Sequence, residues 1–296
     1  MSLPLRISNV RLTAMGIKLL ALDIDGTLLN SQNKLTERTI KTVQETMRSG
    51  VKVVLVTGRR FHAALPIAKE LNCLDMPLIT HNGALSKDPR TLAVFDYNPL
   101  DKNLAQELVL LGRDYKADTL CCDNPQTEGL LVYDHISDSN IRLKAYIATF
   151  HQYAHHVRDL YHYITHPPIQ IFYVGNCELM DEIHEKLTQD LHGQAKVVLT
   201  AYRSSSANMA ILDVINPLCS KGAALKTLAE SLNIEQSEIM AIGDNQNDLE
   251  MLEYAGFPVM MANSDKSLLD KGFTITLSND EGGAAVAMEK YILQKN

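Results

Sequence analysis

The chain has 296 residues, of which 46% are hydrophobic and 21% are charged, and its formal net charge is -7. These values are typical of a globular protein long enough for two domains and argue against a disordered chain. The acidic balance and the lack of a long basic run argue against nucleic acid or an anionic membrane surface as a partner.

Apolar runs that are followed by turn-forming residues predict buried parallel strands whose ends meet at a site. The first two runs are residues 17–26 and 51–59, and the helical pattern between them begins at a Thr36 cap and ends at Gly50. Residues 77–85 continue the alternation of strand and helix. The pattern predicts a Rossmann-like α/β fold with a doubly wound parallel sheet.

The character of the sequence changes between residues 86 and 211, where polar stretches are longer and turn signals more frequent. The alternation of strand and helix resumes afterwards, with a buried strand expected at 239–244. We therefore expect a discontinuous core of residues 17–85 and 212–296 that carries residues 86–211 as a separate insert.

Two carboxylates, Asp23 and Asp25, stand at the end of the first apolar run. Because side chains alternate along a strand, both are expected to point into one cleft. Gly26 permits a turn, whose amides and the Thr27 hydroxyl are suited to receive phosphate oxygens. Open α/β sheets bind ligands at the carboxyl ends of their strands, where this pair lies.

A second acidic group, Asp244 and Asp248, follows the expected strand at 239–244. Bringing it beside Asp23 and Asp25 requires a counter-charge, because neighbouring carboxylates raise one another's pKa values. Oxygen ligands without matching His or Cys residues favour Mg²⁺. Each aspartate alone is more often a turn residue or a helix cap, but the two motifs together indicate a metal site.

Two further residues supply what phosphoryl chemistry still needs. Thr57 follows the second apolar run and offers a hydroxyl donor, and Lys221 offers a fixed positive charge. Either residue alone is commonly structural or solvated, so both assignments depend on their order in the chain.

With these four pieces in this order, the chain resembles the haloacid dehalogenase-like superfamily of phosphatases, and the Cof-type sugar phosphatase branch in particular. The resemblance covers both flanks of the insert. It rests on the motifs LLALDIDGTLL, VVLVTGRR, LITHNGAL, CSKGAALKTL and MAIGDNQNDLEMLEYAGFPVMMANS. The insert matches only in size and position, where this family carries an α/β cap domain that closes over the site.

The resemblance implies that Asp23 attacks phosphorus and forms an aspartyl-phosphate, while Asp25 serves as general acid and then as general base. It also implies Mg²⁺ held by Asp23, the main-chain carbonyl of Asp25 and Asp244, and Asp248 is a further candidate ligand. Thr57 and Lys221 are then expected to stabilise the phosphoryl oxygens.

Other residues of these motifs are candidates for binding the phosphate or the substrate. They are Gly26, Thr27, Gly58, Arg59, Asn82 and Asn247. The sequence departs from the family pattern at Leu218, where a glycine is usual, and at Asp213, where a glutamate is usual. Both departures concern the linker that returns from the insert to the core.

Half of the ten histidines fall in one stretch of the insert, as His151, His155, His156, His162 and His166. His151 and His155 would lie one helical turn apart, a spacing that permits zinc binding. Since no third ligand is evident, a solvated or partner-facing helix is the favoured interpretation.

The five cysteines are an odd number without a CxxC pair, and they suggest neither a disulfide framework nor a zinc ribbon. The first sixteen residues lack the continuous apolar stretch of a signal peptide or membrane span. We therefore expect a cytoplasmic protein.

The favoured function is a Mg²⁺-dependent phosphatase for a small-molecule phosphate ester, either a sugar phosphate or a phosphorylated cofactor such as pyridoxal phosphate. One alternative is a hexose phosphomutase, which bisphosphate dependence would reveal. Another is a non-catalytic phospho-sensing regulator, which a long-lived acyl-phosphate without turnover would reveal. The fold alone does not decide among them.

Overall fold

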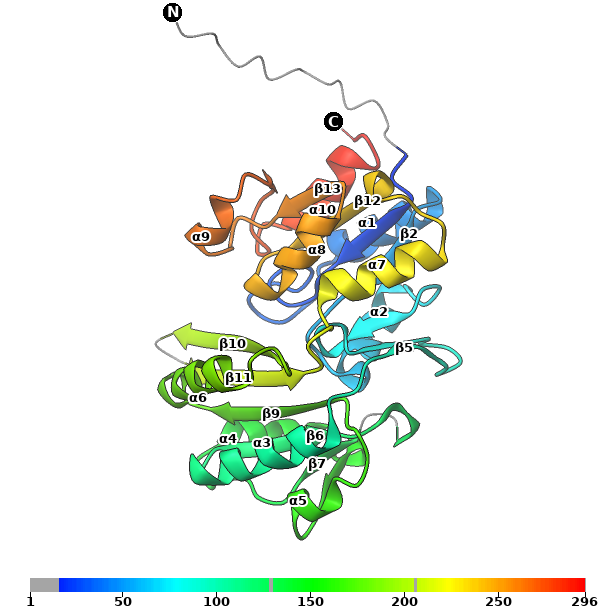
Figure 1. Cartoon of the computed structure of the whole chain (residues 1–296). Coiled ribbons are helices and arrows are strands. Elements are labelled where there is room, and N and C mark those ends of the chain that lie inside the picture. The colour runs from blue at the N-terminus through cyan, green and yellow to red at the C-terminus, as the bar shows by residue number, and fades with distance from the viewer. Residues whose placement is uncertain (1–15, 128–129, 205–206, 296) are drawn as a thin grey trace, which may run out of the picture.

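The computed structural model describes residues 16–127, 130–204 and 207–295. The first and last parts of the chain form one body, and the middle part forms a second body below it (Figure 1). No helix in these three segments is both long and apolar enough to cross a membrane. The prediction that the first sixteen residues form neither a signal peptide nor a membrane span concerns residues that, except for Gly16, lie outside the described part.

The upper body is built on a five-stranded sheet in which every pair of neighbouring strands is parallel. A parallel bridge between Val56 and Ile79 adds β3 (Leu78–Thr80) beside this sheet. In spatial order, the five strands are β14 (Thr274–Ile275), β13 (Phe257–Met260), β12 (Ile239–Gly243), β1 (Leu19–Leu22) and β2 (Lys52–Leu55).

Helices cover both faces of this sheet, because side chains of the strands alternate between two apolar clusters. Leu20 and Leu22 belong to one cluster and Leu19 and Ala21 to the other. Helices α1 (Glu37–Arg48), α2 (Phe61–Leu71) and α10 (Gly283–Tyr291) contribute to the first cluster. Helices α7 (Lys221–Ser231), α8 (Leu249–Tyr254) and α9 (Lys266–Leu269) contribute to the second. The predicted α/β class is confirmed.

Helix α1 illustrates how local sequence sets an element boundary. The Thr36 hydroxyl accepts a hydrogen bond from the Thr39 N–H, so Thr36 caps the helix as predicted. The side chain of Val43 is fully buried in the apolar cluster of that face, and Ile40 and Met47 pack against it.

The lower body contains a six-stranded sheet that is antiparallel except for the pair β7 and β8. Its spatial order is β10 (Lys196–Ser204), β11 (Ala207–Ile215), β9 (Gln170–Gly175), β6 (Asp118–Cys122), β7 (Leu131–Tyr133) and β8 (Ala154–His156). A small sheet of β3, β4 (Leu85–Lys87) and β5 (Val94–Tyr97) accompanies the first crossing between the bodies.

The two faces of the six-stranded sheet have different neighbours. Ile171 and Tyr173 belong to a cluster that includes side chains of α3 (Lys102–Asp114) and α6 (Cys177–Asp190). Phe172 belongs to a second cluster with Leu143 of α4 (Ile141–Thr149). Alternation along β9 therefore turns Phe172 and its neighbours two residues away toward α4.

The prediction of a helix across the histidine-rich stretch is wrong. His151–Tyr153 forms one 3₁₀ turn, Ala154–His156 forms β8, and only Leu160–Tyr163 forms a short α-helix, α5. Pairing of β8 with β7 overrides the local helical pattern, so His151 and His155 do not share a helical face.

Candidate active site

The acidic residues of the two motifs meet at the carboxyl ends of adjacent strands. Asp23 follows β1 and Asp244 follows β12, and these strands pair with Leu22 opposite Ile242. Carboxylate oxygens of Asp23, Asp244 and Asp248 lie within 4.8 Å of one another. The structure therefore brings together three of the four aspartates that the sequence assigned to a metal site.

A buried lysine joins this cluster. Lys221 is the first residue of α7, and its side chain is only 1% exposed. Its Nζ donates to Asp23 Oδ1 at 2.6 Å and to Asp248 Oδ1 at 2.5 Å. Burial disfavours the ammonium charge, but the charges of the two carboxylates outweigh it and raise the pKa of Lys221. The expected fixed positive charge is thus in place.

Asp248 is fully buried and has both oxygens engaged. Its Oδ2 accepts the backbone N–H groups of Asp244 and Asn245, each at 3.0 Å, and its Oδ1 accepts the Lys221 bond. These bonds hold the loop after β12 in shape. Its role as a metal ligand stays a prediction.

The remaining acids carry more negative charge than Lys221 can offset. Burial, followed by the neighbouring charge of Asp248, raises the pKa of Asp23 well above its ordinary value. The same two causes raise the pKa of Asp244 to about 7. A site in which buried acids resist ionisation favours an additional cation.

The turn after β1 fits closely against Asp244. Gly26 has φ +78°, and a Cβ built on it would lie 2.2 Å from Asp244 Oδ2, so a larger residue would displace the carboxylate. The Thr27 hydroxyl donates to Asp244 Oδ1 at 2.8 Å. Thr27, expected as a phosphate donor, is engaged in positioning Asp244.

Asp25 lies apart from the three clustered carboxylates. Arg59 donates from Nε to Asp25 Oδ2 at 2.7 Å and from Nη2 to Asp25 Oδ1 at 2.5 Å. Both side chains are partly exposed and line the main cavity. The sequence predicted Arg59 as a residue that binds the phosphate or the substrate but did not predict this bidentate pair.

Thr57 and Gly58 line the same cavity, and the Thr57 hydroxyl also accepts the backbone N–H of Arg59 at 3.0 Å. Thr57 is nearly fully buried, so its hydroxyl has a fixed position at the end of β2. The structure places both residues where their predicted contact with a phosphate is possible.

A buried amide and carboxylate network connects the core to the linker strands of the insert. Asn247 Nδ2 donates to Asn82 Oδ1 at 2.9 Å, and Asn82 Nδ2 donates to Asp213 Oδ2 at 3.1 Å. Gln170 Nε2 donates to Asp213 Oδ1 at 3.0 Å. Asn247 lines the cavity, whereas Asn82 lies behind it.

Burial raises the pKa of Asp213 to about 7, although the bonds from Asn82 and Gln170 favour its ionised form. Asp213 is one of the two departures from the family pattern, and Leu218 is the other. Leu218 is 77% exposed, and its N–H donates to Asn216 Oδ1 at 2.9 Å. The linker therefore accommodates both departures. Gln170 was missed by the sequence reasoning, and the available signal was a polar residue at the second position of the otherwise mainly apolar run IQIFYV.

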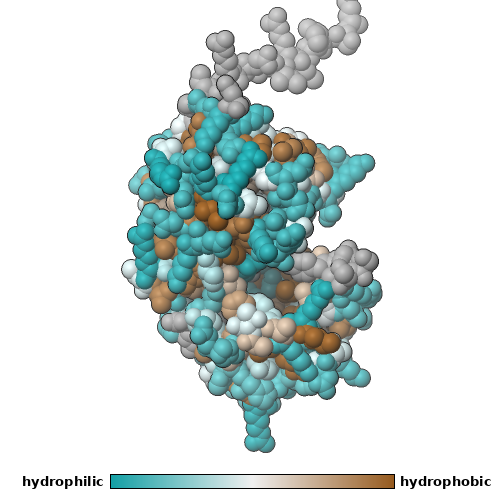
Figure 2. Space-filling model, turned by 180° about the vertical axis from the view of Figure 1, so that it is seen from behind, coloured by the Kyte–Doolittle hydropathy of each residue, from teal (hydrophilic) through white to brown (hydrophobic). Residues whose placement is uncertain are grey.

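A cavity of about 950 Å³ lies between the two bodies, and the surface is visibly hollowed there (Figure 2). Asp23, Asp25 and Lys221 line its upper wall. Side chains of α4, β9 and β11 form the opposite wall. Sequence reasoning assigned no role in the site to the residues of this wall: Arg142, Leu143, Tyr146, Thr149, Phe150, Gln170, Phe172, Val174, Met209, Ile211 and Asp213.

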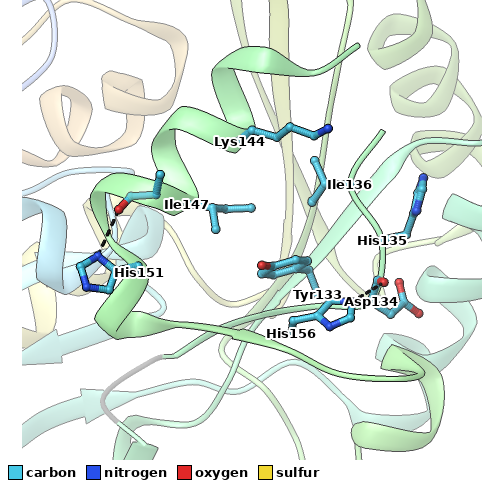
Figure 3. Close-up of a pocket in the computed structure, with 9 residues that line it drawn as sticks. Tyr133, Asp134, His135, Ile136, Lys144, Ile147, His151 and His156 are labelled. Carbon is cyan, nitrogen blue, oxygen red and sulfur yellow. Dashed lines mark hydrogen bonds between the residues drawn. The ribbon is translucent and has the colours of Figure 1, made fainter. Parts of the chain in front are cut away.

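Two histidines of the histidine-rich stretch, His151 and His156, line a smaller pocket of about 420 Å³ in the lower body (Figure 3). His151 Nδ1 lies 3.2 Å from the Ala148 carbonyl oxygen, and His156 Nε2 lies 3.0 Å from that of Asp134. His166 instead contacts the buried Asp123. Among the described residues, the three clustered aspartates are the only group of three or more His, Cys, Asp or Glu side chains close enough together to hold a metal ion.

Strand-end carboxylates, a buried lysine and an inserted second body over the site together indicate a phosphoric monoester hydrolase built on a doubly wound α/β core. A sequence model of the haloacid dehalogenase-like hydrolases matches residues 20–288. The chain belongs to this family.

Relatives match over nearly the whole chain. The stress response protein YhaX of Bacillus subtilis (strain 168) is 30% identical over 294 residues, which cover 94% of each chain. The 5-amino-6-(5-phospho-D-ribitylamino)uracil phosphatase YwtE of the same organism is 28% identical over 305 residues, covering 93% of this chain and 98% of its own.

Solved structures agree with the fold. A haloacid dehalogenase-like hydrolase from Bacteroides thetaiotaomicron superposes with a TM-score of 0.77 at 26% identity, covering 92% of this chain and 98% of its own. The predicted Rossmann-like core with an inserted cap is the architecture of such structures. We accordingly refer to the upper and lower bodies as the core and the cap.

Proposed function

We propose that the enzyme is a Mg²⁺-dependent phosphatase of small phosphorylated metabolites that acts through an aspartyl-phosphate on Asp23. The observation that carries this proposal is the convergence of Asp23, Asp244 and Asp248 around Lys221 at the wall of the main cavity. Residues from three separate parts of the sequence meet there, and their three carboxylates outnumber the one lysine.

The donor set fits Mg²⁺, since it consists of oxygen atoms without histidine or cysteine. Asp23 and Asp244 would hold the ion with their carboxylates, and Asp25 with its main-chain carbonyl. When bound, Mg²⁺ supplies the positive charge that offsets the phosphoryl oxygens. We assign Asp248 to holding Lys221 and the loop, because both of its oxygens are engaged.

In the proposed reaction, a carboxylate oxygen of Asp23 forms a bond to phosphorus while the bond from phosphorus to the leaving oxygen breaks. Asp25 gives its proton to that leaving oxygen. A water molecule then attacks the phosphorus, Asp25 takes a proton from it, and the bond to Asp23 breaks. Arg59 holds the Asp25 carboxylate at the cavity through both oxygens. For Asp25 to carry a proton, one of these two bonds has to open when the substrate is bound.

The proposed substrates are sugar phosphates or a phosphorylated cofactor such as pyridoxal phosphate, because the cavity of about 950 Å³ has room for a small metabolite. The substrate named for the relative YwtE should be tested together with these compounds.

A cytoplasmic location stays our prediction. All five cysteines are free and buried.

Phosphate release from a metabolite panel tests the proposal. The wild-type enzyme is assayed with Mg²⁺, with a chelator, and beside Asp23→Asn. Asp190→Asn, which changes an exposed aspartate paired with Lys186, serves as the matched control.

We expect release only with Mg²⁺ and only from the wild type and the control. Release that persists in the chelator or in Asp23→Asn contradicts the proposal. A requirement for a bisphosphate activator would instead indicate the phosphomutase.

A further inference from the structure

Arg60 is a buried cation on the wall of the main cavity. The residue is 8% exposed, and its Nε donates to the Tyr146 hydroxyl at 3.0 Å. Its guanidinium carbon lies 4.7 Å from the centre of the Tyr146 ring and 5.8 Å from that of Phe150. All of these contacts are with neutral groups.

The described residues include no carboxylate within ion-pair distance of Arg60. Its neighbour in sequence, Arg59, has the bidentate pair with Asp25, and Lys221 has two carboxylates. Buried charges in proteins are normally paired, because an unpaired charge loses its hydration without compensation. Within the described part of the chain, Arg60 therefore has no anionic partner, although its burial favours one.

The cap wall near Arg60 indicates which chemical group would be attached to an anionic partner of Arg60. Phe150, Phe172, Val174, Met209 and Ile211 line the cavity. These side chains exclude water and offer no hydrogen bonds, so a flat apolar ring would gain more here than a polyol.

Polar side chains on that wall are largely committed to one another. Asp213 accepts hydrogen bonds from both Gln170 and Asn82, and the Thr149 hydroxyl donates to the Ala145 carbonyl. A leaving group rich in hydroxyls would lose hydrogen bonds to water and regain few of them.

We propose that Arg60 binds a carboxylate or similar anionic group carried on the leaving alcohol. On this account, which rests on the proposed function, the preferred substrate is a phosphoric monoester of a ring-bearing alcohol with an anionic substituent. Among the described residues, Arg60 donates a side-chain hydrogen bond only from Nε, which leaves its two terminal nitrogens for a bidentate pair. The aromatic rings of Tyr146 and Phe150 hold the guanidinium in place.

A matched pair of substrates tests this role. Benzyl phosphate and 4-carboxybenzyl phosphate share the scissile bond and the ring and differ in the carboxylate. We expect the wild-type kcat/KM to be at least about tenfold higher for the carboxylated ester, the size of a charge-assisted contact. A ratio of one or below overturns the proposal.

Three variants separate the anion-binding role from a purely structural one. In Arg60→Met the ratio should fall to about one, and Arg60→Lys should restore part of it. Tyr146→Phe removes the hydrogen bond between core and cap but keeps the ring, so the ratio should persist. If Arg60→Met lowers kcat/KM for both esters equally and preserves the ratio, Arg60 only fastens the cap to the core and the proposal fails.

A binding measurement separates failure of this inference from failure of the proposed function. Calorimetry should show that 4-(hydroxymethyl)benzoate binds at least about tenfold more tightly than benzyl alcohol, and that Arg60→Met removes the difference. Equal binding of the two alcohols refutes the role of Arg60 even when the panel shows hydrolysis. Absence of hydrolysis across the panel refutes the phosphatase while leaving this binding result interpretable.

Discussion

The two walls of the main cavity differ in chemistry although they face the same space. The core wall carries Asp23, Asp25 and Lys221, and short contacts position their charges, buried ones at Lys221 and a partly exposed one at Asp25. The cap wall carries mainly apolar side chains, among them Phe172 and Ile211. The core wall is suited to transferring a phosphoryl group, and the cap wall is suited to selecting the alcohol portion of the ester.

This difference follows from how the two bodies are built. The ends of parallel strands gather polar residues at one edge of the core sheet. The cap presents the face of an antiparallel sheet, where alternate residues of β9 and β11 form a continuous surface. Changes on the core wall should therefore affect every substrate, and changes on the cap wall should affect substrates unequally.

The largest effect is expected at Asp23. Asp23→Asn should lower kcat by about 10⁴-fold or more for every ester, because the attacking oxygen is lost. Thr57→Val should leave a weakened enzyme, with a loss of about 10- to 100-fold, since the nucleophile remains. Steady-state kinetics on two unrelated esters measures both. Equal losses in the two variants would remove the distinction between nucleophile and supporting donor.

Lys221→Met should destabilise the fold as well as reduce activity. The change leaves Asp23 and Asp248 buried beside each other without their cation, which costs about 3–5 kcal/mol of unfolding free energy. Urea unfolding at pH 7 measures it. Lys226→Met on the same helix is the control, because that lysine is 59% exposed and should change stability by less than about 1 kcal/mol. Similar losses in both variants would contradict the buried cluster.

On the cap wall, Ile211→Ser should alter selectivity rather than chemistry. We expect kcat/KM for a ring-bearing ester to fall by about tenfold, the cost of losing one apolar contact. Hydrolysis of methyl phosphate, which is too small to reach the cap wall, should change less than about threefold. Competition assays with the two esters give the ratio directly. A parallel loss for both would mean that the cap wall does not select.

The smallest effect concerns the pH dependence of stability at Asp213. Its pKa of about 7 in the folded chain exceeds the ordinary value of about 3.9, so the folded state binds the proton more tightly. Unfolding free energy contributed by this group consequently falls as pH rises from about 4 to about 7. Asp213→Asn should remove that slope, so its Tm relative to wild type should be higher at pH 8 than at pH 5. No change in the difference would indicate that Asp213 ionises freely.

The core could be predicted from sequence to a much greater extent than the cap. Asp23, Asp244 and Lys221 each follow or begin an element with a clear local pattern, and strand order alone brings them together. The Arg60 contact with Tyr146 and the network through Gln170 join residues 86 and 43 positions apart, and no local pattern encodes them. The prediction of a helix in the histidine-rich stretch was wrong for the same reason, because pairing with β7 determines the conformation there.

The central claim is that Asp23 receives the phosphoryl group. Asp25→Asn blocks activation of the water, and 4-nitrophenyl phosphate needs little help from an acid, so the intermediate should accumulate in this variant. Acid quenching followed by mass spectrometry of the peptide containing Asp23 is the direct measurement. The account predicts one added phosphoryl group on Asp23; release of a full equivalent of 4-nitrophenol with Asp23 unmodified would contradict it.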